Sequence, residues 1–381
     1  MTRSSGSIGG VTAAAMARLG VPVPMVESQT AANLLSWASA RSKVRAGAAD
    51  VARIAFIGDS KTMGAGAGSG AQGTVGAFAR SRPARIAASL AASGLAMRAD
   101  AWFGAAGLAA VSDVLAYDTR RSGFSGWGGG VVSLGGAALY TANTNPGSFT
   151  PSQPVNRVSL FFPQVPGAAT FSVAKGAESF PVNSGGSNAF VRAEITFSTK
   201  DAAPITITRT GGGNLNITGM VAWDGAIPGV EIANLGIYGA TSALQAGNSS
   251  PWSPLSALVT YAPHLTIVNL GTNDLFQNVP MTTWLGNVRA IATQARASGS
   301  VILAWPSIAG VSPSYGADAV RAQWRAALRG LAAELGCLFV DDEALLGGRA
   351  AAQANGASAD GVHETTWAYD LQASAIVRAI L

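Results

Sequence analysis

The hydrophobic residues of this chain change their spacing twice, and this change limits the folds that the chain can adopt. Up to about residue 106, and again after Glu231, short continuous apolar runs alternate with segments of helical periodicity. Between them, residues 107–229 alternate apolar and polar side chains between turns rich in Gly, Pro and Asn. The first pattern predicts a parallel sheet covered by helices on both faces, and the second predicts an antiparallel sandwich. We therefore expect an α/β fold that is interrupted by an inserted β-sandwich.

The spacing also predicts the individual elements and the domain limits. Expected strands lie at residues 53–57, 232–237, 265–270, 301–305 and 337–340, and expected helices at residues 31–45, 75–92, 282–298, 318–335 and 366–381. Pro83 marks a boundary or kink in the second helix, and Thr282 or Thr283 is a plausible N-cap of the third. We assign residues 1–45 to an N-terminal extension with a lead-in helix, 46–106 and 230–381 to the α/β domain, and 107–229 to the insert. The first 30 residues are expected to be irregular.

The composition argues against several classes of function. Charged residues make up 12% of the chain and no basic block or stripe occurs, so nucleic-acid binding is not expected. No stretch is long and apolar enough to predict a membrane span, and residues 1–30 make a poor signal peptide. The single cysteine, Cys337, excludes an intramolecular disulfide and is expected to be buried. Neither the compartment nor the oligomeric state follows from the sequence, and a cytoplasmic or a phage- or particle-associated protein is compatible with it.

No cofactor or metal is expected. The glycine-dense segment at residues 64–73 has the wrong spacing from its strand for a dinucleotide turn, and no phosphate-loop motif occurs. Two histidines and one cysteine cannot supply the usual nitrogen and sulfur ligands of a metal site.

Two short segments carry the residue types of nucleophilic catalysis. Ser60 follows the end of the first expected strand, and Asp360-Gly-Val-His363 lies near the C-terminus. An Asp three residues before a His can accept the Nδ1 proton within one helical turn, which leaves Nε2 free to face a hydroxyl. A serine at a strand end with a late Asp-x-x-His is the minimal set for acyl transfer.

Four blocks in this order resemble the SGNH (GDSL-type) hydrolase family. They are Gly58-Asp59-Ser60, Asn234-Leu-Gly-Ile-Tyr-Gly239-Ala-Thr-Ser242, Gly271-Thr-Asn273-Asp274 and Asp360-Gly-Val-His363. The resemblance covers roughly residues 50–105 and 230–381. It implies a flavodoxin-like three-layer parallel sheet, with the residues 107–229 as an insertion outside the family pattern.

The resemblance also implies a role for each matching residue. Ser60 would be the nucleophile, His363 the general base and then the general acid, and Asp360 the residue that orients the histidine. The backbone N–H groups of Ser60 and Gly239 and the side-chain amide of Asn273 would hold the oxyanion. Asp59 would support the site as a local acceptor that shapes the serine turn.

Alternative interpretations remain open at several positions. Ser60 could be only an N-cap, His363 a surface residue and Asn273 a turn residue, and Asp274 is expected to cap the segment that follows it. His264 is expected to be structural. The segment Phe103-Gly-Ala-Ala-Gly107 is a rival to the Gly239 block. Lys61 stands where the family commonly has leucine, and is expected to face the solvent or influence an acidic substrate.

These residues predict a serine ester hydrolase that works through an acyl-enzyme, with a carbohydrate O-acetyl group as the favoured substrate. Its partner would be a small acyl ester or an acetylated glycan. Alternatives are a general short-chain esterase or lysophospholipase-like hydrolase, and a non-catalytic glycan-binding or virion or cell-surface structural protein. The insert could bind glycans through exposed aromatic residues, or serve as a lid or oligomerisation domain, and many of its aromatic residues could instead belong to its core. The aromatic candidates are Phe124, Trp127, Tyr140, Phe149 and Trp223.

Overall fold

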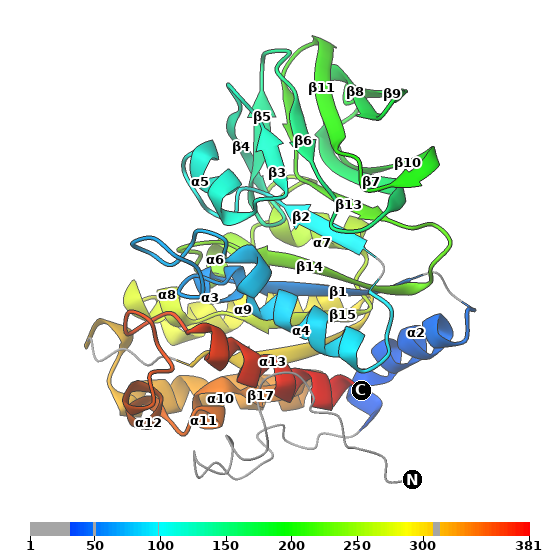
Figure 1. Cartoon of the computed structure of the whole chain (residues 1–381). Coiled ribbons are helices and arrows are strands. Elements are labelled where there is room, and N and C mark those ends of the chain that lie inside the picture. The colour runs from blue at the N-terminus through cyan, green and yellow to red at the C-terminus, as the bar shows by residue number, and fades with distance from the viewer. Residues whose placement is uncertain (1–30, 49–50, 98, 308–312) are drawn as a thin grey trace.

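The computed structural model describes residues 31–48, 51–97, 99–307 and 313–381. The α/β part and the insert form distinct layers, with the insert at the top of Figure 1 and the C-terminus at the opposite side. The expectations for residues 1–30, including the irregular start, lie outside the described residues.

A five-stranded parallel sheet forms the centre of the α/β part. Its strands lie in the order β14-β1-β15-β16-β17, and their bounds are β1 Val51–Gly58, β14 Gly229–Gly236, β15 Leu265–Asn269, β16 Ser300–Trp305 and β17 Leu338–Asp341. Counted along the chain within this sheet, the order is 2-1-3-4-5, which is the flavodoxin-like order. The strand order reverses between β1 and β15, and ligands of such folds bind at the carboxyl ends of the strands at this point.

Helices cover both faces of this sheet, as the alternation of side chains along β1 shows. Ile54 and Phe56 pack in one cluster with residues of α2 (Leu35–Arg45), α4 (Arg82–Ala92) and α13 (Thr366–Ile380). Ala55 and Ile57 pack on the other face with residues of α7 (Pro254–Tyr261), α9 (Met281–Arg296) and α10 (Asp318–Leu335). Because both faces are buried, the strands read as continuous apolar runs in the sequence.

The insert is an antiparallel sandwich. One sheet has the order β10-β7-β13-β2 and the other β3-β6-β11-β8-β9, and a three-stranded ribbon β12-β5-β4 lies beside them. Their bounds are β2 Ala99–Phe103, β3 Arg121–Gly123, β4 Gly128–Ser133, β5 Gly136–Thr141, β6 Gly147–Phe149, β7 Val155–Gln164, β8 Ala169–Lys175, β9 Glu178–Asn183, β10 Ala189–Asp201, β11 Ile205–Gly212, β12 Leu215–Ile217 and β13 Gly219–Trp223. Alternate residues of the two sheets, such as Leu160 of β7 and Phe171 of β8, share one core.

The four-stranded sheet of the insert is buried on its second face as well. There, Phe103 and Phe161 pack against Tyr261 of α7, with ring centroids 5.5 and 6.1 Å apart. Strand β2 belongs to this sheet by its pairing with β13, while Met97 just before it bridges to Val230 of β14. The chain thus passes between the two parts before residue 106, and the division at residues 106 and 107 stays a proposal.

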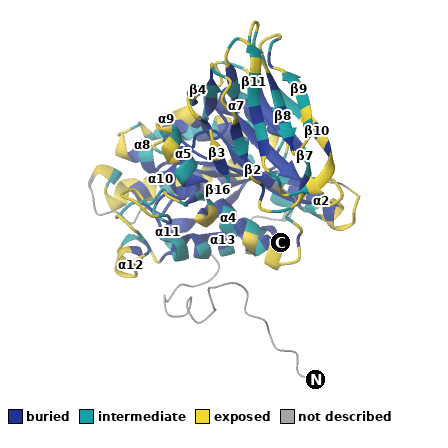
Figure 2. Ribbon diagram, turned by 45° about the horizontal axis from the view of Figure 1, so that its top comes forward, coloured by how far each residue is buried: buried dark blue, intermediate teal, exposed yellow. Residues whose placement is uncertain are grey.

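The short elements complete the fold. They are η1 Ala31–Leu34, α3 Ser60–Met63, η2 Phe78–Arg80, α5 Val111–Tyr117, α6 Ser242–Gln245, α8 Thr272–Phe276, η3 Pro313–Tyr315, α11 Asp342–Leu345 and α12 Arg349–Ala354. Figure 2 shows that exposed residues gather on the outer sides of the helices and at the strand ends, around a buried interior.

Three helix predictions differ in outcome. The helix at residues 318–335 has the predicted bounds and ends at Gly336 with a φ of +61°. The predicted helix at 75–92 is wrong in its first turns, because α4 begins only at Arg82, where Pro83 occupies the first turn. The predicted N-cap of the helix at 282–298 is also wrong, since α9 begins at Met281 after Pro280 and no side chain caps it.

The expected aromatic surface of the insert is wrong as well. Phe124, Trp127, Phe149 and Trp223 are each at most 6% exposed. Phe124, Trp127 and Phe149 lie in the sandwich core, and Trp223 packs toward the α/β part. Only Tyr140 of the five keeps partial exposure. Three of the rings fill the core between the sandwich layers, and only Trp223 is buried because the second face of the inner sheet is also covered.

Candidate active site

The local backbone presents Ser60 at the carboxyl end of β1. Asp59 is the N-cap of α3, and its Oδ1 accepts a hydrogen bond from the N–H of Lys61 at 2.9 Å. The turn has no room for a side chain at Gly58, because a Cβ there would lie 2.8 Å from the carbonyl oxygen of Asn269. Ser60 therefore caps nothing itself, and its hydroxyl is available to other groups.

His363 and Asp360 come together with Ser60 across 303 residues of sequence. Nε2 of His363 lies 2.8 Å from Oγ of Ser60, and Nδ1 of His363 lies 2.7 Å from Oδ2 of Asp360. The Asp-x-x-His segment is a bend and not the helical turn that we expected. Asp360 Oδ1 accepts from the backbone N–H groups of Val362 and His363 at 2.9 and 2.7 Å, and these bonds fix the bend.

The electrostatics of Asp360 suit a residue that stays ionised beside the histidine. Partial burial opposes ionisation, but hydrogen bonds from the side chain and backbone of His363 outweigh it and lower the pKa of the Asp360 carboxyl well below its usual range. An ionised Asp360 can accept a hydrogen bond from Nδ1–H, and in that tautomer the lone pair of Nε2 faces the Ser60 hydroxyl.

The glycine-dense segment packs against the histidine bend. A Cβ at Gly66 would lie 2.7 Å from Cβ of His363 and 2.7 Å from the carbonyl oxygen of Glu364, and Gly66 has a φ of +89°. Only glycine allows this close approach and this backbone conformation. The glycines of this segment thus serve the backbone packing of the site.

The three expected oxyanion donors lie on neighbouring segments. Asn273, on α8, donates one N–H of its amide to the carbonyl oxygen of Ala240 at 2.9 Å, which orients the amide next to the Gly239 loop. Gly239 is exposed, with a φ of +73°. Its neighbours Tyr238 and Ala240 donate their N–H groups to Ala106 and Ile237. Among the described residues, no acceptor is recorded for the N–H of Gly239.

Two polar side chains, Asp274 and Gln245, tie these segments together through partners that the sequence did not indicate. Asp274 accepts from the N–H and the Oγ of Ser242 at 3.0 and 2.6 Å, so it caps α6 and not the segment that follows it in sequence. Gln245 donates to the carbonyl oxygens of Gly58 and Leu235 at 2.7 and 3.0 Å. Both residues stand inside or just after the family-like blocks, but no local pattern indicates their partners.

The rival segment and the second histidine have structural positions. The N–H of Gly104 donates to Thr218 O at 2.6 Å, and the carbonyl oxygen of Ala106 accepts from the N–H of Tyr238 at 2.8 Å. The rival segment therefore lies against the Gly239 loop and supports it. His264 Nδ1 accepts from the N–H of Arg53 at 2.9 Å, and burial lowers the pKa of its imidazole.

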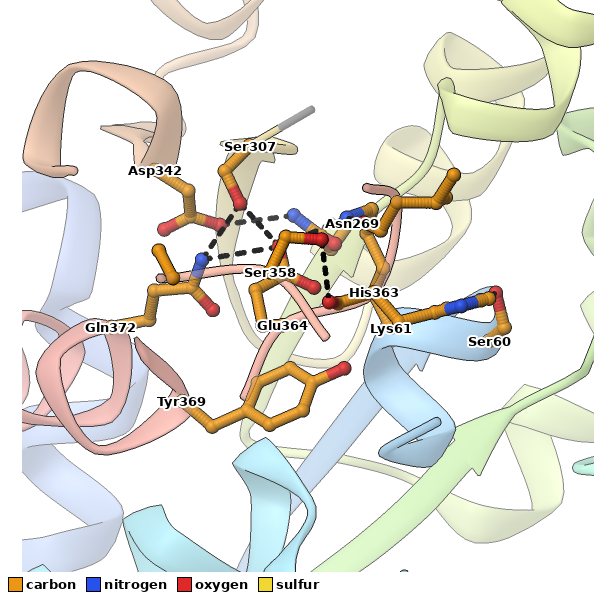
Figure 3. Close-up of polar contacts among 12 residues, drawn as sticks. Ser60, Lys61, Asn269, Ser307, Asp342, Ser358, His363, Glu364, Tyr369 and Gln372 are labelled. Carbon is orange, nitrogen blue, oxygen red and sulfur yellow. Dashed lines mark hydrogen bonds and ion pairs between the residues drawn. The ribbon is translucent and has the colours of Figure 1, made fainter. Parts of the chain in front are cut away.

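The expectation for Lys61 is wrong. Its side chain is 3% exposed and points away from the solvent, toward Glu364 of the histidine bend (Figure 3). Nζ of Lys61 lies 3.0 Å from Oε1 of Glu364 and also donates to the carbonyl oxygen of Val362. Asp59, on the other side of Ser60, is fully buried, and this burial raises the pKa of its carboxyl to about 6 although Lys61 opposes the shift.

Aromatic rings stand beside the catalytic groups. Tyr238 lies parallel to the ring of His363, with centroids 6.0 Å apart at 26°. Phe276, 50% exposed, is one helical turn after Asn273, and its ring centroid lies 5.3 Å from that of Tyr315. Burial, and after it the charges of Asp360 and Tyr238, raise the pKa of the Tyr315 hydroxyl.

Neither a metal-binding cluster nor a membrane-spanning helix occurs in the part of the chain that the structure describes. No group of three or more His, Cys, Asp and Glu residues is arranged to hold a metal ion there. Among those same residues, every helix is too short or too polar to cross a bilayer.

Known proteins resemble this chain in one family pattern and in fold. Residues 205–371 match the family described as GDSL-like lipase/acylhydrolase, a span that contains Gly239, Asn273, Asp360 and His363 but not Ser60. No curated protein matches significantly in sequence.

Among solved structures, a peptidoglycan O-acetylesterase aligns over 93% of this chain and 98% of its own, with a TM-score of 0.67 and 19% identity. An acetylxylan esterase from Geobacillus stearothermophilus aligns over 40% of this chain and 73% of its own, with a TM-score of 0.34 and 21% identity. A Bacillus subtilis protein aligns over 74% and 97%, with a TM-score of 0.36 and 14% identity.

The family match covers the late blocks, the fold match covers both the parallel sheet and the sandwich, and Ser60 lies within reach of the imidazole that the match includes. Residues 205–371 thus carry the pattern of the GDSL-like lipase/acylhydrolase family, and the chain has a parallel α/β fold with an antiparallel β-sandwich inserted into it.

Proposed function

We propose that Ser60, His363 and Asp360 act as a catalytic triad that hydrolyses an acyl ester. The contact of 2.8 Å between Ser60 Oγ and His363 Nε2 carries this proposal. Oγ attacks the ester carbonyl carbon while its proton passes to Nε2, and the carbonyl oxygen becomes an oxyanion. The alcohol leaves with the proton from Nε2, so that an acyl-serine remains. A water molecule then repeats the attack, and the acid leaves as Ser60 regains its proton.

The oxyanion is held by the N–H of Ser60, the N–H of Gly239 and the amide of Asn273 in this mechanism. The bond from Asn273 to Ala240 uses one amide N–H and leaves the second for the substrate. Donors that are fixed before the reaction stabilise the negative charge without reorganisation.

We infer that the alcohol part of the substrate is a carbohydrate and the acyl group is acetyl. The solved structure that aligns over both the sheet and the sandwich is that of a peptidoglycan O-acetylesterase. In this chain, Phe276 and Tyr315 offer a partly exposed aromatic surface one helical turn from the oxyanion amide. Aromatic faces bind the apolar face of a sugar ring, so this surface replaces the insert as the candidate for glycan contact.

The substitution Ser60→Ala tests the reaction. We expect turnover of acetylated glycans and of p-nitrophenyl acetate to fall by about 10⁴-fold or more while the fold stays intact. A fluorophosphonate probe should label the wild-type protein at Ser60, because only an activated serine reacts. Full activity in Ser60→Ala, or a wild-type serine that the probe does not label, would exclude the triad and favour a non-catalytic glycan-binding protein.

The substitution Phe276→Ala tests the substrate class. For an acetylated glycan, we expect kcat/KM to fall by about 10-fold, whereas the value for p-nitrophenyl acetate should change little, because that ester has no sugar to stack. Equal changes for both esters, or faster hydrolysis of p-nitrophenyl esters with longer acyl chains, would favour the short-chain esterase or lysophospholipase-like alternative.

A further inference from the structure

The two residues that follow the proposed nucleophile and the proposed base form a buried ion pair with each other. Lys61 is next to Ser60, Glu364 is next to His363, and Nζ of Lys61 lies 3.0 Å from Oε1 of Glu364. The two side chains are 3% and 4% exposed. The ion pair therefore joins the same two segments, the serine turn and the histidine bend, as the contact from Ser60 to His363 does. It lies on the interior side of that contact.

The Lys61 side chain links the serine turn to the histidine bend, in addition to the close packing of Gly66 against His363. The bend is held internally by Asp360, and Lys61 adds a bond to the carbonyl oxygen of Val362, the residue before His363. A single ammonium group thus contacts the bend on both sides of the histidine. This arrangement restrains the position and the orientation of the imidazole relative to Oγ of Ser60.

The carboxylate of Glu364 is itself fixed from the opposite side. Its Oε1 accepts from Ser307 Oγ and from Gln372 Nε2, the latter at 3.4 Å, and Gln372 also donates to Ser307 at 3.0 Å (Figure 3). Gln372 belongs to α13, so the restraint extends from the serine turn through Glu364 to a long helix of the α/β part.

From these contacts we infer that Lys61 and Glu364 are positioning residues that hold His363 in register with Ser60. They touch neither the substrate nor the reacting atoms. The inference rests on the proposed triad, since it explains what keeps Oγ of Ser60 and Nε2 of His363 at 2.8 Å from each other. Small displacements of catalytic groups are costly, because a shift of about 1 Å lowers the rate by about 10²-fold.

The substitution Lys61→Met tests this role, and Lys175→Met is its matched control. Lys175 of the sandwich has a side chain that is 1% exposed, forms an ion pair with Asp201 at 2.5 Å and donates to the carbonyl oxygen of Thr199 at 2.9 Å. Both substitutions leave a carboxylate without its ammonium partner and should lower Tm. Only Lys61→Met should lower kcat, by about 10- to 100-fold with KM within about twofold of wild type.

The rate of Ser60 labelling by a fluorophosphonate provides a readout that needs no substrate. We expect Lys61→Met and Glu364→Gln to slow labelling as they slow turnover. The double variant should be no slower than the slower single variant, because the two residues act as one unit. Lys61→Arg, which keeps the positive charge, should be faster than Lys61→Met.

The outcomes separate the two proposals. If the wild-type serine is not labelled and no ester is hydrolysed, the proposed function fails. If the wild type is labelled and folded Lys61→Met reacts within about twofold of it, the positioning role is overturned and the function stands. Should Lys61→Met fail to fold, the variants Glu364→Gln and Lys61→Arg provide the test. Labelling and kcat at the wild-type level in Glu364→Gln would overturn the positioning role. Slower labelling in Glu364→Gln, with labelling at the wild-type rate in Lys61→Arg, would support it.

Discussion

The carboxyl group of Asp59 gives this fold a stability that depends on pH in an unusual direction. Asp59 is fully buried, and burial raises its pKa from 3.8 to about 6. The folded state therefore binds a proton that the unfolded state has already lost in this pH window. Stability from Asp59 is fully present below the unfolded pKa and is lost as the pH rises through the folded pKa. The difference of about 2 pKa units corresponds to about 3 kcal/mol.

The substitution Asp59→Asn removes this titration. Asn keeps an oxygen that can accept the N–H of Lys61, and any constant cost of the new amide is the same at all pH values. We expect the free energy of unfolding of Asp59→Asn, relative to wild type, to rise by about 2.5 kcal/mol between about pH 4 and about pH 8. Asp342, whose pKa burial also raises to about 6, is present in both proteins and cancels.

Urea unfolding followed by circular dichroism across this pH range measures the difference. Asp113→Asn, at an exposed position of α5, is the matched control and should show a flat difference. An equally flat profile for Asp59→Asn would refute the reasoning, because it would mean that Asp59 ionises in the folded state as it does in the unfolded one.

Two other substitutions test the oxyanion amide and the lead-in helix. Asn273→Ala should lower kcat by about 10²–10³-fold with little change of KM, because one donor to the oxyanion is lost; steady-state kinetics with p-nitrophenyl acetate measure this, and an unchanged kcat would remove Asn273 from the site. Trp37→Ala should lower the free energy of unfolding by about 3–5 kcal/mol, because Trp37 is fully buried and its Nε1 donates to the carbonyl oxygen of Ile380 at 2.8 Å. Leu35→Ala, at a position 63% exposed on the same helix, should change stability by less than about 0.5 kcal/mol in the same urea titration, and equal losses in both variants would contradict this packing role.

The parallel sheet could be predicted from the sequence because a strand that is buried on both faces consists of a continuous run of apolar residues. All residues of β15 and β16 are buried, and each of the five expected strands of the α/β part is present within a few residues. The strand-end positions of Ser60 and Asn273 follow from the same runs. Their convergence needs only the rule that strand ends of a parallel sheet meet at one edge.

Side-chain direction was harder to predict wherever a long-range partner decides it. A lysine is exposed by default, since burying its ammonium alone is costly. Lys61 is buried because Glu364 lies across from it, and these two residues are 303 positions apart in the chain. The prediction of an exposed aromatic surface on the insert failed for a related reason. Alternation of apolar and polar residues shows that a strand has two faces, but it does not show that a second layer covers the face expected to meet water. Trp223 is buried there against the α/β part.

The sandwich packs on the α/β part and lies against the loop that carries the proposed oxyanion donor Gly239. Its inner sheet packs on α7 through Phe103, and the segment that leaves β2 reaches the oxyanion loop. Ala106 accepts the N–H of Tyr238, and a Cβ at Gly107 would lie 2.7 Å from that same nitrogen, so the residue before Gly239 is held by backbone contact with the root of the insert. Tyr238 in turn stacks beside His363. A sandwich that only carried a binding surface would not need this backbone contact with Tyr238, because a flexible linker would be enough to attach it to the α/β part. The chain leaves and re-enters the α/β fold where the backbone of Ala106 and Gly107 also contacts Tyr238, the residue before the proposed oxyanion donor Gly239.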